Sequence, residues 1–173
     1  MNANPHMQHS TRQRHELPFD WPTVPFHIVL VEPVIPPNTG NIARLCAATA
    51  TPLHLIEPLG FDLSEKQLRR AGLDYWESVD LTLHPSFTAY ESAFPNARRW
   101  LFTTAGQLDH AHLSYQPGDH LLFGSETHGL SDHILHHYPN HQCNIPIQLT
   151  AVRSLNLANA VSIALYTALR NRS

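Results

Sequence analysis

Short apolar runs alternate with segments of helical periodicity along most of the chain, and this alternation narrows the possible folds more than any other feature. The apolar runs are typical of strands at residues 26–31, 53–56, 79–83, 100–103, 121–123 and 144–147. Helical patterns cover residues 38–49, 64–71, 86–94, 132–138 and 155–169. Strands that alternate with helices are typical of parallel sheets, because each helix returns the chain to the starting edge. The sequence therefore predicts an α/β domain with a mainly parallel sheet flanked by helices.

One of these strands runs directly into a polar loop that is bracketed by glycines. The apolar run at 121–123 is followed by Gly124 and Gly129, and Glu126 is the only charged residue between them. Glycine has no Cβ, so the backbone here can turn tightly and come close to a ligand. We interpret residues 124–129 as a binding loop. The alternative is an ordinary turn in which Ser131 caps the following helix.

Length and composition indicate one domain that is preceded by a tail. The chain has 173 residues, 42% of them apolar, and no apolar run long enough to cross a bilayer. Residues 1–25 are rich in polar residues and proline, so we expect a mobile tail, with a single domain over 26–173. Cys46 and Cys143 fit no metal-ligand spacing, and no signal peptide is apparent, which favours a reducing cytoplasm. Cys46 falls on an apolar helix face and is expected in the core.

The charge balance excludes a strongly basic nucleic-acid-binding protein. Charged residues make up 14% of the chain and the formal net charge is -3, so any RNA partner must use a local patch. Lys66, Arg69 and Arg70 share one face of the short predicted helix and form such a patch. A solvated helix face is the alternative interpretation.

Three polar clusters follow predicted strands and are expected to meet. They are residues 38–44, where Asn38 or Thr39 is the expected N-cap, 124–129 and 153–159. Ligands of parallel α/β sheets bind at the carboxyl ends of the strands. The sequence therefore predicts one site built from three separated segments.

The same three segments resemble the motifs of the SPOUT superfamily of RNA methyltransferases, most closely the branch that methylates the ribose 2'-hydroxyl of the tRNA wobble nucleotide. The first motif runs from Glu32-Pro33 to Pro37-Asn38-Thr39-Gly40-Asn41-Ile42-Ala43-Arg44. The second is Leu122-Phe123-Gly124-Ser125-Glu126-Thr127-His128-Gly129-Leu130, and the third is Ile145-Pro146 followed by Arg153-Ser154-Leu155-Asn156-Leu157-Ala158-Asn159-Ala160-Val161. Arg69-Arg70-Ala71-Gly72-Leu73-Asp74-Tyr75 is similar to a further signature of this branch. Together these motifs span about residues 26–172.

The resemblance implies a C-terminal deep trefoil knot, a homodimer, tRNA as the partner and S-adenosylmethionine as the cofactor. It places the cofactor against Phe102, Gly124, Ile145 and Ser154, with contributions from Glu126, Asn156 and Asn159. Leu122, Ile145 and Leu155 could sandwich the adenine, although core packing is equally expected for Leu122. It implies no metal and no membrane.

The resemblance also assigns the chemistry of the acceptor. It places Arg44 beside the ribose hydroxyl, with Asn38 and Tyr166 as further catalytic candidates. A guanidinium keeps its proton far above neutral pH, so we expect Arg44 to orient the acceptor and to stabilise developing negative charge. For RNA docking it implies Lys66, Arg69, Arg70 and Arg153, because phosphate contacts position the substrate.

Three other functions remain open from the sequence alone. The enzyme could methylate another RNA, such as ribosomal RNA, or the chain could be a non-catalytic RNA-binding protein of the same fold. A zinc hydrolase would use the histidines at His133, His136, His137 and His141, but no carboxylate completes a convincing site.

Overall fold

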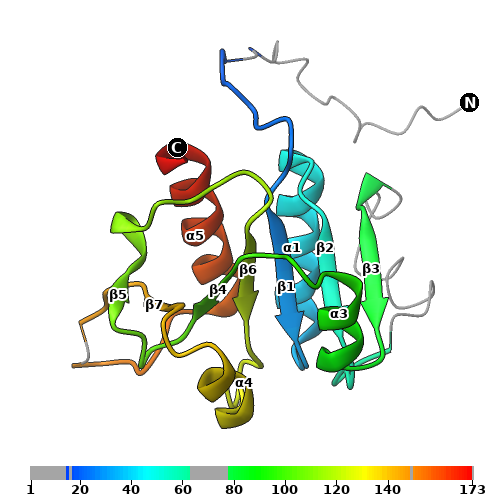
Figure 1. The fold of residues 1–173 in the computed structure, drawn as a ribbon, viewed down its shortest axis with the longest axis vertical. Coiled ribbons are helices and arrows are strands. Elements are labelled where there is room, and N and C mark those ends of the chain that lie inside the picture. Colours follow the sequence, from blue (N-terminus) through cyan, green and yellow to red (C-terminus); the bar gives the residue numbers. More distant parts are fainter. Residues whose placement is uncertain (1–14, 16, 63–77, 149, 173) are drawn as a thin grey trace, which may run out of the picture.

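Strand β1 (His27–Val31) lies near the centre of a seven-stranded sheet in which every adjacent pair is parallel (Figure 1). The computed structural model describes residue 15 and residues 17–62, 78–148 and 150–172. The other strands are β2 (Leu53–Ile56), β3 (Leu81–His84), β4 (Arg99–Phe102), β5 (Leu108–Asp109), β6 (His120–Phe123) and β7 (Gln142–Asn144). The predicted α/β class with a mainly parallel sheet is confirmed.

The strand order β3-β2-β1-β6-β4-β7-β5 departs from the order along the chain in its second half. After β3 the chain crosses to β4 and β5, and the later strands then fill the spaces left between earlier ones. β6 pairs with both β1 and β4, and β7 pairs with both β4 and β5. The loops that follow β4, β6 and β7 are therefore neighbours at the carboxyl ends of the strands.

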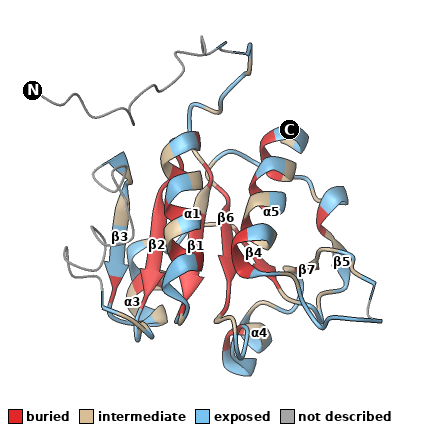
Figure 2. Ribbon diagram, turned by 180° about the vertical axis from the view of Figure 1, so that it is seen from behind, coloured by how far each residue is buried: buried red, intermediate tan, exposed pale blue. Residues whose placement is uncertain are grey.

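Two layers of helices cover the sheet (Figures 1 and 2). One face carries α1 (Pro36–Thr49) and α5 (Leu157–Asn171), and the other carries α3 (Phe87–Ala93) and α4 (Asp132–His137). A 3-10 helix, η2 (His110–His112), follows β5. None of the helices in the described part of the chain has the length and apolar character of a membrane span.

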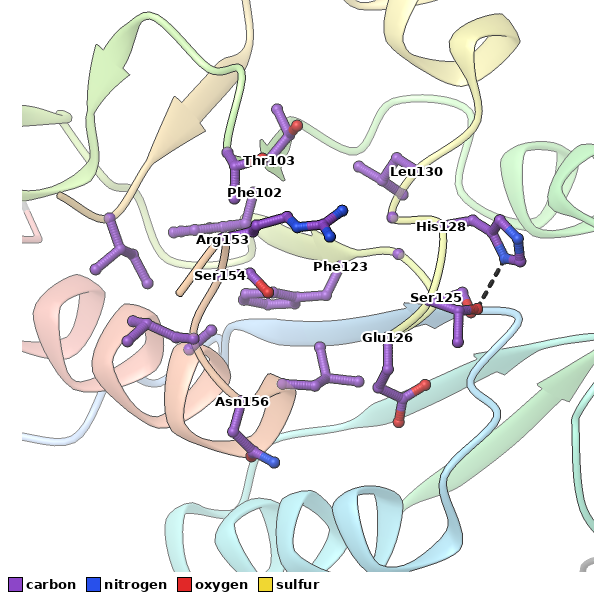
Figure 3. A pocket seen from close by; sticks show the side chains of 18 of the residues that line it. Phe102, Thr103, Phe123, Ser125, Glu126, His128, Leu130, Arg153, Ser154 and Asn156 are labelled. Atoms are coloured by element: carbon purple, nitrogen blue, oxygen red, sulfur yellow. Dashed lines mark hydrogen bonds between the residues drawn. The ribbon is translucent and has the colours of Figure 1, made fainter. Parts of the chain in front are cut away.

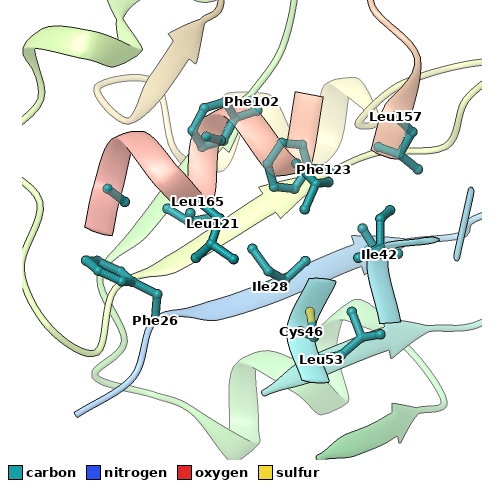
Figure 4. Packing of buried hydrophobic residues seen from close by; sticks show 14 of the residues in the cluster. Phe26, Ile28, Ile42, Cys46, Leu53, Phe102, Leu121, Phe123, Leu157 and Leu165 are labelled. Atoms are coloured by element: carbon teal, nitrogen blue, oxygen red, sulfur yellow. The ribbon is translucent and has the colours of Figure 1, made fainter. Parts of the chain in front are cut away.

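Each face of the sheet has its own apolar core. The first core cluster lies under α1 and α5 and includes Ile28, Cys46, Leu121, Phe123 and Leu165 (Figure 4). The second core cluster lies under α3 and α4 and consists of Val29, Val31, Ile56, Tyr90, Leu101, Leu122, Leu130 and Ile134. Successive strand residues point to opposite faces, so β6 contributes to both clusters. The prediction that Cys46 is a core residue is confirmed, since only 1% of it is exposed.

Several element boundaries differ from those predicted from the sequence. Helix α1 begins at Pro36 after the N-cap Ile35 rather than at Asn38 or Thr39, because proline is tolerated at the first helical positions, where no N–H is needed. β7 ends at Asn144, so Ile145–Ile147 is not a strand; Pro146 has no N–H to continue a ladder. The segment 104–118, where the sequence predicts neither a strand nor a helix, contains β5 and η2. The predicted helix at 64–71 lies outside the described residues.

The last residues before β1 contact the end of α5. Phe19 packs against the first core cluster, and the Arg170 guanidinium lies 4.8 Å from the centre of its ring. Asp20 forms an ion pair of 2.9 Å with Arg172, and Trp21 contacts the Phe19 ring with 4.6 Å between centroids. The expected mobility of residues 1–25 remains a prediction, but its described portion from 17 onward has these contacts with α5.

Candidate active site

A cavity of about 660 Å³ opens at the carboxyl edge of the sheet. Its walls come from the segments that follow β1, β4, β6 and β7 and from the loop that leads into α5. In Figure 3, Arg153 and Ser154 of that loop lie beside Phe102 and Phe123 at the ends of β4 and β6. A cavity of this size suits a small-molecule cofactor, for which about 300–1,000 Å³ is usual. The predicted convergence of three polar segments on one site therefore occurs in this structure.

The floor of the cavity is aromatic and the walls are mixed in polarity. The Phe102 and Phe123 rings stack with centroids 4.7 Å apart and planes 15° apart. Ile145 and Leu155 add apolar surface, whereas the side chain of Arg153 adds a positive charge. Such a combination suits a ligand that has a flat apolar part and polar or charged groups.

The binding loop 124–129 is closed by a contact that only glycine allows. The Gly129 N–H donates a hydrogen bond of 2.8 Å to the Ser125 carbonyl, and Gly129 has φ +69°. A Cβ on Gly124 would lie 2.0 Å from the carbonyl carbon of Gly129. The loop therefore folds back onto its own first residue. Ser131 does cap α4, accepting from the Ile134 N–H at 3.4 Å. The cap is compatible with a binding loop, which remains a prediction.

The Glu126 carboxylate connects this loop to the start of α1. Its Oε2 accepts from the Val34 N–H at 2.9 Å, and its Oε1 accepts from the Ile35 N–H at 3.3 Å and from Asn38 Nδ2 at 3.0 Å. Hydrogen bonds to an ionised acceptor are about twice as strong as neutral ones. Glu126 thus fixes the backbone of the first motif from 92 residues away in the sequence.

Asn38 and Asn156 extend this connection to α5. Asn156 Nδ2 donates to Asn38 Oδ1 at 2.9 Å, and Asn156 Oδ1 accepts from the N–H groups of Ala158 and Asn159 as the N-cap of α5. Asn38 is 6% exposed and uses both ends of its amide in these contacts. We call Glu126, Asn38 and Asn156 the polar relay. It joins all three motif segments through side chains alone.

Among the residues predicted to bind the cofactor, most line this cavity. Those that do are Phe102, Gly124, Glu126, Ile145, Ser154 and Asn156. Asn159 does not line it and contributes its N–H to the cap of α5. Leu122 is fully buried in the second core cluster, so core packing is the correct interpretation of that residue.

The residues predicted for catalysis are not all in the cavity. Asn38 lines it as part of the polar relay. Arg44 is exposed on α1, and Tyr166 is 46% exposed on α5; neither lines the cavity. Arg44 stands six residues after Asn38, about 9 Å along the helix and on a different face. Their roles remain predictions.

The residues predicted to bind RNA are placed only in part. Arg153 lines the cavity and is exposed. Lys66, Arg69 and Arg70 lie outside the described residues. No group of three or more histidine, cysteine or acidic residues in the described ranges could hold a metal ion, so His133, His136, His137 and His141 do not form the zinc site weighed above.

Sequence reasoning missed several residues that shape the cavity. Thr103, Thr104 and Asn144 line it from the ends of β4 and β7, and Ile35 lines it ahead of α1. Asn144 Nδ2 donates to the Thr104 carbonyl at 3.1 Å and so joins two of these loops. The sequence feature that could have identified them is their position at or directly after the ends of strands, where ligands of parallel sheets bind.

Replacing Glu126 with alanine should test the polar relay. The part-buried Val34 N–H and the Asn38 amide would lose their acceptor, whereas the exposed Ile35 N–H can bind water instead. The loss should therefore be about 1–3 kcal/mol of unfolding free energy. Urea unfolding measures this loss. The control Asp132→Ala removes another acidic residue that lines the cavity and should cost less than about 1 kcal/mol, since Asp132 only favours the first turn of α4. Equal losses in the two variants would contradict the relay.

The chain is similar to known proteins over most of its length. Residues 25–166 match the model of the SpoU rRNA Methylase family. The chain is 47% identical over 146 residues to the tRNA (cytidine(34)-2'-O)-methyltransferase of Methylovorus glucosotrophus (strain SIP3-4), covering 84% of this chain and 94% of the relative. It is 50% identical over 145 residues to the protein of that name from Escherichia coli (strain K12), covering 83% and 92%.

Solved structures share the same fold. A structure described as giving insights into the 2-OH methylation of C/U34 on tRNA superposes with a TM-score of 0.78 and 49% identity, over 84% of this chain and 95% of the other. The methyltransferase AviRb from Streptomyces viridochromogenes, in complex with the cofactor AdoMet, has a TM-score of 0.70 at 24% identity and shares the fold over 85% of this chain and 57% of its own. By its sequence match and by these relatives, the chain belongs to the SpoU rRNA Methylase family.

Proposed function

We propose that this protein transfers a methyl group from S-adenosylmethionine to the ribose 2'-hydroxyl of the wobble nucleotide of tRNA. The observation that carries the proposal is the cavity whose loops are joined by the polar relay. The names of the relatives near 50% identity support cytidine at position 34 as the acceptor, and the solved structure concerned with C/U34 supports the same position.

The residues present suit this cofactor. Phe102, Ile145 and Leu155 offer apolar surface for an adenine ring, and the backbone at Gly124 lies at the cavity wall. When bound, S-adenosylmethionine supplies a methyl group activated by a positive sulfur. Little further activation is required of the protein, so its main contribution is to hold the acceptor in line and close.

Arg153 and Arg44 are the proposed contacts to the RNA. Arg153 lies at the cavity and can bind the phosphate next to the acceptor nucleotide through its forked donors. Arg44 would orient the 2'-oxygen and stabilise the negative charge that develops as its proton leaves. Lys66, Arg69 and Arg70 would extend the phosphate contacts along the tRNA.

A homodimer would bring Arg44 and Tyr166 to a site that this subunit does not complete alone. Ile163 and Tyr166 are 40% and 46% exposed on the outer face of α5 and would supply apolar contacts to such an interface. We propose that Arg44 serves the cavity of the partner subunit. A trefoil knot in the C-terminal part of the chain belongs to the same proposal and follows from the family resemblance. A cytoplasmic location belongs to it as well and is supported by the free cysteines Cys46 and Cys143.

The proposal is tested by methylating tRNA in vitro. The protein is incubated with unmodified tRNA and S-adenosylmethionine, and the nucleosides are analysed by mass spectrometry after digestion around the anticodon. We expect 2'-O-methylcytidine or 2'-O-methyluridine at position 34, and none on a ribosomal RNA fragment. A methylated ribosomal RNA would favour the rRNA alternative. Failure to bind S-adenosylmethionine in calorimetry would favour a non-catalytic RNA-binding protein.

A further inference from the structure

Four histidine side chains, three of them buried and His27 partly buried, form one layer on the α3 face of the sheet. They come from four adjacent strands: His84 from β3, His54 from β2, His27 from β1 and His120 from β6. His54 and His120 are each 3% exposed and His84 is 6% exposed. The four rings are neighbours across adjacent strands near the centre of the sheet. We call these four residues the histidine layer.

The histidine layer is continuous through hydrogen bonds and stacked rings. His84 Nε2 and His54 Nδ1 are 3.1 Å apart, and His54 Nε2 and His27 Nδ1 are 2.9 Å apart. The His27 ring stacks on His120 with centroids 4.2 Å apart and planes 7° apart. The Tyr90 hydroxyl of α3 lies 2.7 Å from His120 Nδ1. A change in the charge of one imidazole therefore alters the electrostatic energy of the other rings and the hydrogen bond to Tyr90 of α3.

The groups around the layer offer little compensation for an added positive charge. The Arg99 guanidinium of β4 lies 5.2 Å from the Tyr90 ring centre and disfavours a charge on His120. Asp80, ahead of β3, attracts a charge on His27. Glu91 of α3 accepts a hydrogen bond of 2.6 Å from Tyr138. Among the described residues no carboxylate forms a hydrogen bond or ion pair with the four rings.

Burial keeps these imidazoles neutral near neutral pH. Desolvation, followed by the charges of His27 and His84, lowers the pKa of His54 to about 3. Desolvation also lowers the pKa values of His27, His84 and His120. In the unfolded chain each would take up a proton near its usual pKa of about 6.5. Because the folded pKa values are lowered, folding stability is fully present above that value and is lost as the pH falls below it.

We propose that the histidine layer is an acid-sensitive latch: in mild acid, protons bind to these rings in an opened state, which shifts the equilibrium toward release of α3 and a looser binding loop. Protonation of two neighbouring rings would place like charges within a layer that is also packed against the Phe94 ring. Moving α3 away from the sheet would reduce this repulsion, because water could then reach the charged rings. Tyr90 of α3 and Phe94 at its C-cap are the side chains that would move with it.

The second core cluster connects the latch to the cavity. Tyr90 is a member of that cluster, as are Leu130 at the end of the binding loop and Ile134 of α4. Leu130 also lines the cavity. Loosening α3 therefore removes support from the back of the loop that follows β6. The first core cluster, on the other face, contains none of these residues.

Urea unfolding at a series of pH values tests the proton uptake. If His54 and His120 alone stay neutral in the folded chain, the unfolding equilibrium constant should rise about a hundredfold between pH 7.5 and 5.5. In His54→Gln the rise should shrink to about tenfold, because one of the two protons is no longer taken up. The control His133→Gln changes an exposed histidine of α4 and should keep the full rise. A His54→Gln profile that matches the parent overturns the latch.

Hydrogen exchange locates the opening and does not depend on the variant folding. Amide protection factors of the unmodified protein are compared at pH 7.5 and 5.5 after correction for the intrinsic exchange rate. Protection should fall first in 87–93 and 128–130, while 157–169 of α5 keeps its protection. A uniform loss over the whole chain, or an unfolding constant that changes less than tenfold over this range, would contradict the proposal. Neither measurement requires methyl transfer, so failure of the proposed activity would leave the result interpretable.

Discussion

A Gly124→Ala substitution is expected to abolish cofactor binding. The added Cβ would lie 2.0 Å from the Gly129 carbonyl carbon, 2.1 Å from the Leu130 nitrogen and 2.3 Å from the Gly129 oxygen. All three are backbone atoms and cannot rotate away, so the pairing of Ser125 with Gly129 must break. We expect S-adenosylmethionine affinity to fall at least a hundredfold, about 2.7 kcal/mol, in isothermal calorimetry. Urea unfolding should show a loss of about 1–3 kcal/mol from overpacking.

The matched control for this experiment is Gly129→Ala. A Cβ at Gly129 meets no atom within 4 Å, so the only cost is the positive φ of +69°. That strain is worth about 1–2 kcal/mol of stability, and the loop should keep its shape. Both variants would lose some stability, but only Gly124→Ala should lose the cofactor. Binding by Gly124→Ala at the strength of the parent would show that the close contact is not needed for the site.

The alternation of strands and helices was readable from the sequence because buried parallel strands are short and almost uniformly apolar. That same uniformity hides which way each side chain points. Leu122 faces α3 and α4 in the second core cluster, whereas Phe123 faces the other side and lines the cavity. When the residues on both faces of a strand are apolar, no polar residue indicates which side chains point to which face of the sheet. For this reason the sequence alone could not separate Leu122 from the residues predicted to bind the cofactor.

The strand order and the hydrogen bonds of the polar relay could not be predicted from local sequence patterns either. No residue pattern in or near β6 and β7 indicates that each of them inserts between two strands that precede it in the sequence. Glu126 and Asn38 stand 88 residues apart, and Asn156 stands 118 residues from Asn38. Their positions after predicted strands, together with the family motifs, grouped the three segments, but the hydrogen bonds between these side chains could be seen only in the folded structure. The structure thereby gives Glu126 and Asn156 a concrete task, which is to hold the loops around the cavity in register.

Arg44→Ala is expected to reduce the methylation rate at least a hundredfold, the scale seen when one stabilising donor is removed from an active site. Arg44 is exposed on α1, so the variant should fold with little loss of stability. Cofactor affinity should be nearly unchanged, because Arg44 does not line the cavity. Single-turnover methylation of tRNA and calorimetry with S-adenosylmethionine measure the two effects separately. A parallel loss of cofactor affinity would place Arg44 in the binding of S-adenosylmethionine instead.

Mixed dimers decide which subunit Arg44 serves. Arg44→Ala is co-expressed with Ser154→Trp, which fills the exposed rim of the cavity, and the two chains carry different affinity tags so that only mixed dimers are purified. If Arg44 acts across the interface, one site joins an intact cavity to an intact Arg44, and the mixed dimer should regain about half of the parent rate. If Arg44 acts within its own subunit, both sites are defective and the rate stays at the level of the single variants. We expect recovery, because the described cavity of one subunit is lined by Arg153 but not by Arg44, and the developing charge on the acceptor oxygen still requires a donor.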